Sequence, residues 1–439
     1  MKRTTRTRAS DGLRPVLGLL WALALPALAQ SPDDAPPPAG AAAEEQTAGV
    51  DSLRRIRDAL VAAGDFDAAL APARQLVDRL RADGDPALPH ALAQLARIQA
   101  ELDDFESAEL NYLEAIDLIS TAEGEFSITL VEPYQGLGRT YIKNRQFVEA
   151  ITALEQAQHV SQRNLGLYNV SQSELLDDLT TAHLGLGDTV TAEQLQVERL
   201  ENAVRRFGEN DPQVIPYRYE LAAYYEQSRM RGAAREQYEE VVATLEALPD
   251  GGDEALLAPL RRLMRIELVL GDTEDARTRL VEILNRRPDL PPAERARSLV
   301  ALGDWAVARN DPEGARSYYA DAYALLRDVP EELEAAFARP AMLDFVAPLT
   351  DVDRGTRARP YTWGTIVVGF DVTANGRPSN VRIVSAQPPG VVDDEYVRRV
   401  RETHFRPRVV DGVPVATTGV RFTHYFRYYV DPDEDDEES

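Results

Sequence analysis

Residue types that carry catalysis or hold metals are sparse in this chain. There is no cysteine, which excludes disulfides, thiolate nucleophiles and cysteine-ligated zinc. No nucleophile elbow, phosphate loop or dinucleotide fingerprint occurs. The five histidines do not stand at metal-ligand spacing from one another or from a carboxylate; they are His90, His159, His183, His404 and His424. The sequence therefore predicts a protein with no metal, no cofactor and no catalytic residues, that is, not an enzyme.

Carboxylates are the most abundant reactive groups, with 73 acidic residues against 48 basic ones and a net charge of −25. A general acid–base pair would need two carboxylates in one pocket, and no spacing singles out such a pair. Nucleic acid requires clustered Lys and Arg, and anionic membrane surfaces repel acidic proteins. We expect protein partners, no nucleic acid and no small-molecule substrate.

The first 29 residues have the layout of a secretory signal peptide. A basic start precedes the apolar core PVLGLLWALALPALA at 15–29, which ends in the small-residue pattern ALA. This core is shorter than the roughly 20 residues of a spanning helix, and Pro26 interrupts it. We expect cleavage before Gln30; the alternative is an uncleaved segment that anchors the chain in the inner membrane. Residues 30–49, rich in Pro, Ala and acid, are predicted to form a disordered linker.

Residues 50–328 contain an internal repeat. An alanine follows each of seven turns at spacings of 39 or 42 residues, and an aliphatic residue precedes each alanine by thirteen positions. The alanines are Ala69, Ala108, Ala150, Ala192, Ala234, Ala276 and Ala315, and their partners are Ile56, Leu95, Leu137, Leu179, Leu221, Leu263 and Leu302. The flanking apolar residues recur at helical spacing. Each unit is therefore predicted to be an antiparallel helix pair, and the pairs must stack because neither helix can bury its apolar stripe alone.

The repeat resembles the tetratricopeptide repeat. LARIQ at 95–99, LGRTY at 137–141, LAAYY at 221–225 and LGDWA at 302–306 are similar to its first-helix signature. GENDPQVIPYRYELAAYYEQ, from Gly208, resembles the 42-residue variant of kinesin light chains. The resemblance implies a mostly α fold, a right-handed α-solenoid of about seven helix pairs with a concave groove for a peptide. Two units depart from the pattern, with Thr180 and Met264 where a small residue is expected.

After a connector at 329–360, residues 361–430 change to the period of β-strands. Ile366, Val368, Phe370 and Val372 alternate with other residues, and Asn375-Gly376 suits a hairpin turn. NVRIVSA reads as the returning strand, VDDEYVRRVRETHF as a helix, and TGVRFTHYFRYYV as a final strand. The predicted order is β-β-α-β, a small α+β domain. DPDEDDEES, at 431–439, is predicted to be an acidic disordered tail.

This terminal segment resembles the TonB C-terminal domain over about 70 residues. The resemblance rests on VVGFDVTANGRPSNVRIVSAQPPG, on FRPRVVDGVPV and on GVRFTHYFRY. FRP at 405–407, followed by DGVPV at 411–415, is the most specific part. The resemblance implies a domain that pairs with a short strand of outer-membrane receptors.

The final strand is the predicted partner-binding element. A three-stranded sheet has at least two edge strands, whose unpaired N–H and C=O groups can accept an extended peptide. The predicted binding residues are Val420, Arg421, Phe422, Thr423, His424, Tyr425, Phe426, Arg427 and Tyr428. The alternatives are an edge that pairs with its copy in a dimer and an edge that faces water. Since 360–430 holds nine arginines and six acids, the acidic repeats or tail could shield it.

Two hypotheses for function follow. The first is a periplasmic adaptor, in which the repeats bind one protein and the TonB-like domain is presented to an envelope or outer-membrane partner. The alternative is a TonB-type energy transducer for receptor-mediated transmembrane transport, anchored by an uncleaved N-terminal segment. The apolar segment holds no His or Ser at 15–29, and a solenoid replaces the long Pro-rich spacer of that family. An enzyme hidden in the repeats would need a buried polar pocket, for which no motif is present.

Overall fold

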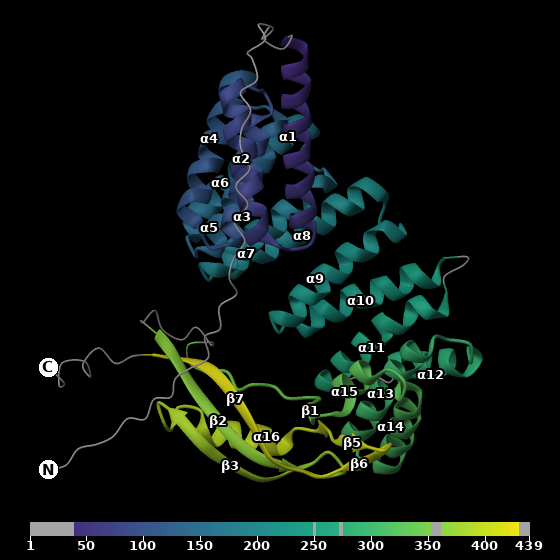
Figure 1. The fold of residues 1–439 in the computed structure, drawn as a ribbon. Helices are drawn as coiled ribbons and strands as arrows, with labels where there is room; N and C mark the ends of the chain where they lie inside the picture. Colours follow the sequence, from purple (N-terminus) through teal and green to yellow (C-terminus); the bar gives the residue numbers. More distant parts are fainter. Residues whose placement is uncertain (1–38, 249–251, 272–274, 351, 353–360, 430–439) are drawn as a thin grey trace, which may run out of the picture.

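The computed structural model describes residues 39–248, 252–271, 275–350, 352 and 361–429. The predicted signal peptide at 1–29, the start of the predicted linker and the predicted acidic tail at 431–439 lie outside these residues. Within the described ranges the chain forms a solenoid of helix pairs followed by a small sheet domain beside the last pair (Figure 1). The predicted fold class, a tetratricopeptide-like solenoid before a small α+β domain, is confirmed.

Seven helix pairs build the described part of the solenoid. They are α1 (Ala39–Ala62) with α2 (Phe66–Asp83), α3 (Leu88–Glu101) with α4 (Phe105–Glu123), α5 (Val131–Lys143) with α6 (Phe147–Leu165), α7 (Ser173–Gly185) with α8 (Thr189–Phe207), α9 (Ile215–Gln227) with α10 (Arg231–Glu246), α11 (Asp253–Leu270) with α12 (Asp275–Arg286), and α13 (Pro292–Ala308) with α14 (Pro312–Leu326). A single helix, α15 (Pro330–Phe337), follows in the predicted connector.

The repeat markers explain how each pair closes. All seven marker alanines are buried, with at most 3% of their surface exposed, as expected where two helices approach closely. Six of the seven aliphatic partners are buried as well. Aspartates cap several second helices; for example, Asp104 accepts a hydrogen bond from the Ser107 amide. The 39- or 42-residue period thus corresponds to one helix pair and its two turns.

The first helix departs from the sequence prediction in two ways. Ile56, predicted to fill the gap in the first pair, is 48% exposed. The residues of α1 that pack on the next helices are instead Val50, Leu53, Leu60 and Val61, because no earlier pair among the described residues covers the opposite side. In addition, α1 begins at Ala39, so residues 39–49 are helical, and the prediction of a disordered linker there was wrong. The run of alanines and glutamates at 41–45 has high helix propensity, which accounts for the difference.

The interior of the solenoid becomes polar between α7 and α9. Arg199 of α8 is buried and pairs with Asp177 of α7 at 3.1 Å and with Glu220 of α9 at 2.7 Å. The Thr180 hydroxyl donates to the Leu176 carbonyl at 2.7 Å, which satisfies this polar group at a position where a small residue is usual. The apolar clusters of α3–α7 are accordingly separate from the cluster that begins at Ala192 of α8 and continues through α14.

A carboxylate in the C-terminal half of the solenoid should make its stability depend on pH. Burial, with Asp275 and Glu239 nearby, raises the pKa of Glu267 on α11 from 4.5 to about 7. Between these two values the folded state binds more protons than the unfolded state, so the free energy of unfolding falls as pH rises. Because Glu267 is only half-buried, we expect Glu267→Gln to stabilise the protein by roughly 1–2 kcal/mol at pH 8 and hardly at all at pH 4.5.

Urea unfolding of both forms at several pH values measures this effect. Glu246→Gln is the matched control, since Glu246 lies on neighbouring α10 and pairs with the half-exposed Arg279 at 3.3 Å. Loss of that surface pair should change the free energy of unfolding by under about 1 kcal/mol. A stability difference between wild type and Glu267→Gln that is the same at pH 4.5 and pH 8 would contradict the assigned role of this carboxyl.

The terminal domain is a three-stranded antiparallel sheet in the order β3-β2-β7 with one helix. Its elements are β2 (Tyr361–Val372), β3 (Pro378–Gln387), α16 (Asp393–Glu402) and β7 (Thr417–Tyr429), which confirms the predicted β-β-α-β order. Short strands β4 (Phe405–Arg406), β5 (Arg408–Val410) and β6 (Val413–Val415) lie between α16 and β7. The predicted alternation along β2 is confirmed, because Ile366, Val368, Phe370 and Val372 are all buried.

The connector completes the core of this domain. Strand β1 (Ala341–Met342) pairs with β4, and the following residues run over the face of the sheet that also carries α16. The ring of Phe345 lies 5.7 Å from Tyr396 of α16 and 5.3 Å from Phe422 of β7. One face of the sheet is therefore covered by α16 and by the connector together.

Candidate functional site

The terminal domain is fixed to the last helix pair by the segment that carries its most specific sequence signature. Arg406 donates to the Asp304 carboxylate of α13 from Nε and from Nη2, each at 2.7 Å, and to the Ala336 carbonyl at 2.9 Å. The hydroxyl of Tyr319 on α14 donates to the same carboxylate at 2.9 Å. Val409 belongs to the apolar cluster of the solenoid. The repeats therefore hold the sheet in one orientation.

Strand β7, the predicted partner-binding element, lies at the edge of the sheet. It pairs with β2 from Tyr361–Tyr429 to Val372–Thr417, and among the described residues no strand pairs with its other side. The prediction that the last strand is an edge is confirmed; that it binds a partner stays a prediction. Strand β3 is the second edge.

The nine predicted residues divide between the two faces of the sheet, as the alternation of a strand requires. Five face the covered side: Val420, Phe422, Phe426 and Tyr428 pack in the domain core, and His424 stacks 5.0 Å from the ring of Tyr396. Four face the other side: Arg421, Thr423 and Tyr425 are exposed, and Arg427 lies 5.5 Å from the ring of Tyr361. Only these four offer side chains on the uncovered face.

A groove of about 370 Å³ runs beside this edge. One wall is β7 from His424 to Arg427, and the other is the turn between α9 and α10, Gln227–Arg229. Pro348, Leu349 and the 64%-exposed Trp363 line the rest. An extended segment added to β7 would thus also contact the solenoid, which the sequence could not indicate.

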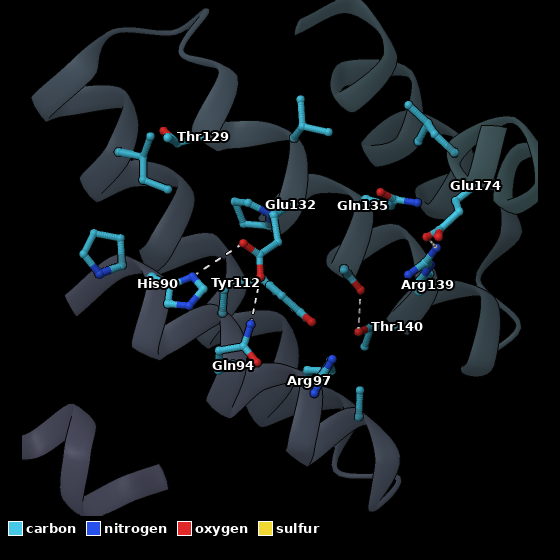
Figure 2. Close-up of a pocket in the computed structure, with 18 of the residues that line it drawn as sticks. His90, Gln94, Arg97, Tyr112, Thr129, Glu132, Gln135, Arg139, Thr140 and Glu174 are labelled. Atoms are coloured by element: carbon cyan, nitrogen blue, oxygen red, sulfur yellow. Dashed lines mark hydrogen bonds and ion pairs between the residues drawn. The ribbon is translucent and has the colours of Figure 1, made fainter. Parts of the chain in front are cut away.

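A larger groove, of about 1030 Å³, lies on the first helices of the N-terminal pairs. His90, Gln94 and Arg97 line it from one face of α3, and Glu132, Gln135 and Arg139 line it from α5 (Figure 2). Glu101 and Lys143 lie further along the same two helices and belong to the lining as well. Val61, Phe66, Pro86 and Pro89 add apolar surface at one end. The size and the mixed lining suit a peptide better than a compact metabolite.

Charges in this larger groove are mostly paired. His90 lies 3.5 Å from Glu132, and this contact raises the pKa of His90 and lowers the pKa of Glu132. Lys143 pairs with Glu101 at 2.6 Å, and Arg139 pairs with Glu174 at 3.1 Å. Arg97, on the same face of α3 as His90, is exposed. The groove therefore presents both signs of charge, with Arg97 available to an acidic group.

Sequence reasoning predicted a groove but not its residues. The signal lies in the polar positions of α3, because 90, 94, 97 and 101 share one helical face opposite the buried Leu92 and Leu95. A solvated helix face has the same pattern. Only the stacking of α3, α5 and α7 distinguishes a groove from an ordinary surface.

Comparison with known proteins finds a family match at the C-terminal end and a limited likeness to solved repeat structures. Residues 360–427 match the family described as Gram-negative bacterial TonB protein C-terminal. The crystal structure of BtubC (BKLC) from P. vanneervenii is 22% identical and has a TM-score of 0.40, covering 51% of this chain and 91% of its own. The kinesin light chain with nearly identical TPR-like repeats from Podosopora anserina is 19% identical, with a TM-score of 0.39 over 46% of this chain and 94% of its own.

The C-terminal part of a TPR repeat-containing protein from Cytophaga hutchinsonii is 14% identical with a TM-score of 0.42, covering 64% of this chain and 98% of its own. No protein with a curated function matches the chain by sequence. These TM-scores lie below 0.5, so the description of the repeats rests on the helix pairs and their buried markers. The chain is a tetratricopeptide-like helical scaffold that carries a TonB-like C-terminal domain, as predicted.

The described residues hold neither a membrane-spanning helix nor a metal-binding cluster. In the described ranges, which begin at Ala39, no helix combines the length and the apolar character that a membrane crossing needs. The same residues contain no group of three or more side chains arranged to hold a metal ion.

Proposed function

We propose that this protein is a non-catalytic adaptor of the Gram-negative periplasm. The solenoid binds one protein in its N-terminal groove, and the TonB-like domain takes an extended segment of an envelope or outer-membrane protein along β7. The observation that carries the proposal is the position of β7: an edge strand, paired on one side only among the described residues, beside a groove. Strand addition to such an edge satisfies backbone groups on both chains.

The contacts that fix the sheet to the last helix pair favour an adaptor over two independent binding modules. The buried contact between Arg406 and Asp304 couples the edge strand to the same body that forms the groove. A partner on β7 is thus held at a defined position relative to a partner on α3 and α5.

Site-specific photo-crosslinking tests the role of the edge. With a benzoylphenylalanine photo-crosslinker in place of Thr423, which is exposed on β7, we expect adducts whose partner peptides map to one extended segment of an envelope protein. The matched control places the same probe at Val384, which is exposed on the opposite edge strand β3. Adducts at neither position, or equally at both, would overturn the proposal.

The match to the TonB C-terminal family also favours a second candidate, an energy transducer anchored in the inner membrane. The two candidates differ in the N-terminus of the mature protein. An adaptor begins at Gln30 and is recovered in the soluble periplasmic fraction. A transducer retains residues 1–29 and is recovered with the inner membrane.

A further inference from the structure

The groove beside β7 has an unusual charge for this protein. Its lining includes Arg229 and Arg427 and contains no carboxylate. The chain as a whole carries 73 acidic residues against 48 basic ones. A groove that holds two arginines and no acid in such a chain favours an acidic occupant.

The solenoid wall of the groove adds to this positive field. Arg229 is exposed at the α9–α10 turn, with a positive φ of 62°. Burial first, and then the nearby Arg229 and Arg265, lower the pKa of the Arg231 guanidinium, while Glu226 acts in the opposite direction. A carboxylate placed in the groove would relieve this repulsion.

The chain itself supplies an acidic segment at the correct place. β7 ends at Tyr429, two residues beyond Arg427 of the groove wall, and is followed by VDPDEDDEES at 430–439, in which seven of ten residues are acidic. Asp431-Pro432-Asp433 is a typical turn sequence, since Pro favours the second position of a tight turn and Asp its neighbours. A reversal there would direct residues 434–439 back along the outer side of β7.

The length of this segment matches the groove. Six residues in extended conformation span about 20 Å, which reaches from the end of β7 to about Tyr425, within the groove wall of His424 to Arg427. Because Asp is depleted in strands, the pairing would be held mainly by charge and would be easy to displace.

We propose that the groove between β7 and the α9–α10 turn binds acidic extended segments, and that residues 430–439 of the same chain occupy it. The segment covers the edge of β7 until a partner with a better strand displaces it. This inference rests on the proposed function in that the same edge receives the partner.

Engineered disulfides test the occupancy in the full chain, which has no native cysteine to interfere. Ser228→Cys places a thiol in the groove, and Asp436→Cys places one in the acidic segment. The matched control combines Asp436→Cys with Ser385→Cys, an exposed position on the opposite edge strand β3. We expect the Ser228 pair to form a disulfide under mild oxidation at least tenfold faster than the Ser385 pair.

Charge reversal tests whether electrostatic attraction holds the acidic segment in the groove. Arg229→Glu, or 0.5 M NaCl, should slow the Ser228–Asp436 disulfide roughly tenfold, because the attraction is electrostatic and exposed to salt. Arg382→Glu, on β3, should have no effect. Equal disulfide rates at Ser228 and Ser385, no disulfide at either, or a rate indifferent to Arg229 would each overturn the proposal.

The outcomes separate this inference from the proposed function. If the disulfide fails while the probe at Thr423 still captures an envelope segment, self-occupancy is wrong and the adaptor stands. If the disulfide forms while that probe captures none, self-occupancy stands and the adaptor role is wrong.

Discussion

Replacing Asp304 with alanine is expected to release the terminal domain from the solenoid. The carboxylate accepts two hydrogen bonds from Arg406 and one from the Tyr319 hydroxyl. The side chains of Arg406 and Asp304 are only 17% and 14% exposed. Without Asp304 the guanidinium stays in a largely buried site with no counter-charge. Breaking such a pair from one side costs about 3–5 kcal/mol.

Hydrogen exchange measures the loss of stability at the junction between the terminal domain and the solenoid. Amides of β4 to β6 and of the C-terminal end of α13 should exchange roughly a hundredfold to a thousandfold faster, since 1.4 kcal/mol corresponds to a factor of ten. Amides of α3 to α6, which belong to other apolar clusters, should not change. Exchange at β4 that stays within twofold of wild type would contradict the role given to this ion pair.

A double variant separates the ion pair from simple packing. Asp304→Leu together with Arg406→Met removes both charges and keeps apolar volume at the junction. Replacement of a whole buried pair by hydrophobic residues is often neutral, so we expect this variant to recover most of the lost protection. A double variant as unstable as Asp304→Ala would mean that shape, rather than charge pairing, holds the domains together.

The parts of the fold that were predictable are those set by local periodicity. The buried alanines recur with the helix pair itself, so Ala69 and Ala315 could be recognised without any knowledge of the neighbouring units. Alternation along β2 likewise predicted which residues face the core. The predicted burial of Ile56 was wrong, because the environment of this residue depends on whether another helix pair lies before it.

For the site beside β7, the sequence could predict the strand but not the groove next to it. Nine residues of β7 were expected to bind, but pairing with β2 and covering of one face by the connector leave four on the uncovered face. The groove wall at Arg229 lies almost 200 residues from β7 in the sequence. The contact between Asp304 and Arg406 spans 102 residues. Contacts of this range depend on how the solenoid curves, which no local pattern records.

Gly376, in the turn between β2 and β3, provides a second large effect. Its φ of +76° belongs to the left-handed region, where a side chain costs about 1–2 kcal/mol. A Cβ atom there would lie 2.2 Å from the Phe405 carbonyl oxygen and 2.6 Å from Cγ1 of Val307 on α13. Because the nearest atom belongs to the backbone of β4, relief requires the turn to move away from β4 as well as from Val307. We expect Gly376→Ala to lower the free energy of unfolding by at least about 3 kcal/mol.

Urea unfolding of Gly376→Ala and Gly390→Ala distinguishes backbone strain from the close approach. Gly390 has a similar φ of +84°, but a Cβ atom would meet nothing within 4 Å. Gly390→Ala should therefore cost only the conformational term, about 1–2 kcal/mol. The difference between the two variants reports the contact of the β2–β3 turn with Phe405 and α13. Equal losses would show that this turn does not press on Phe405 or on the last helix pair.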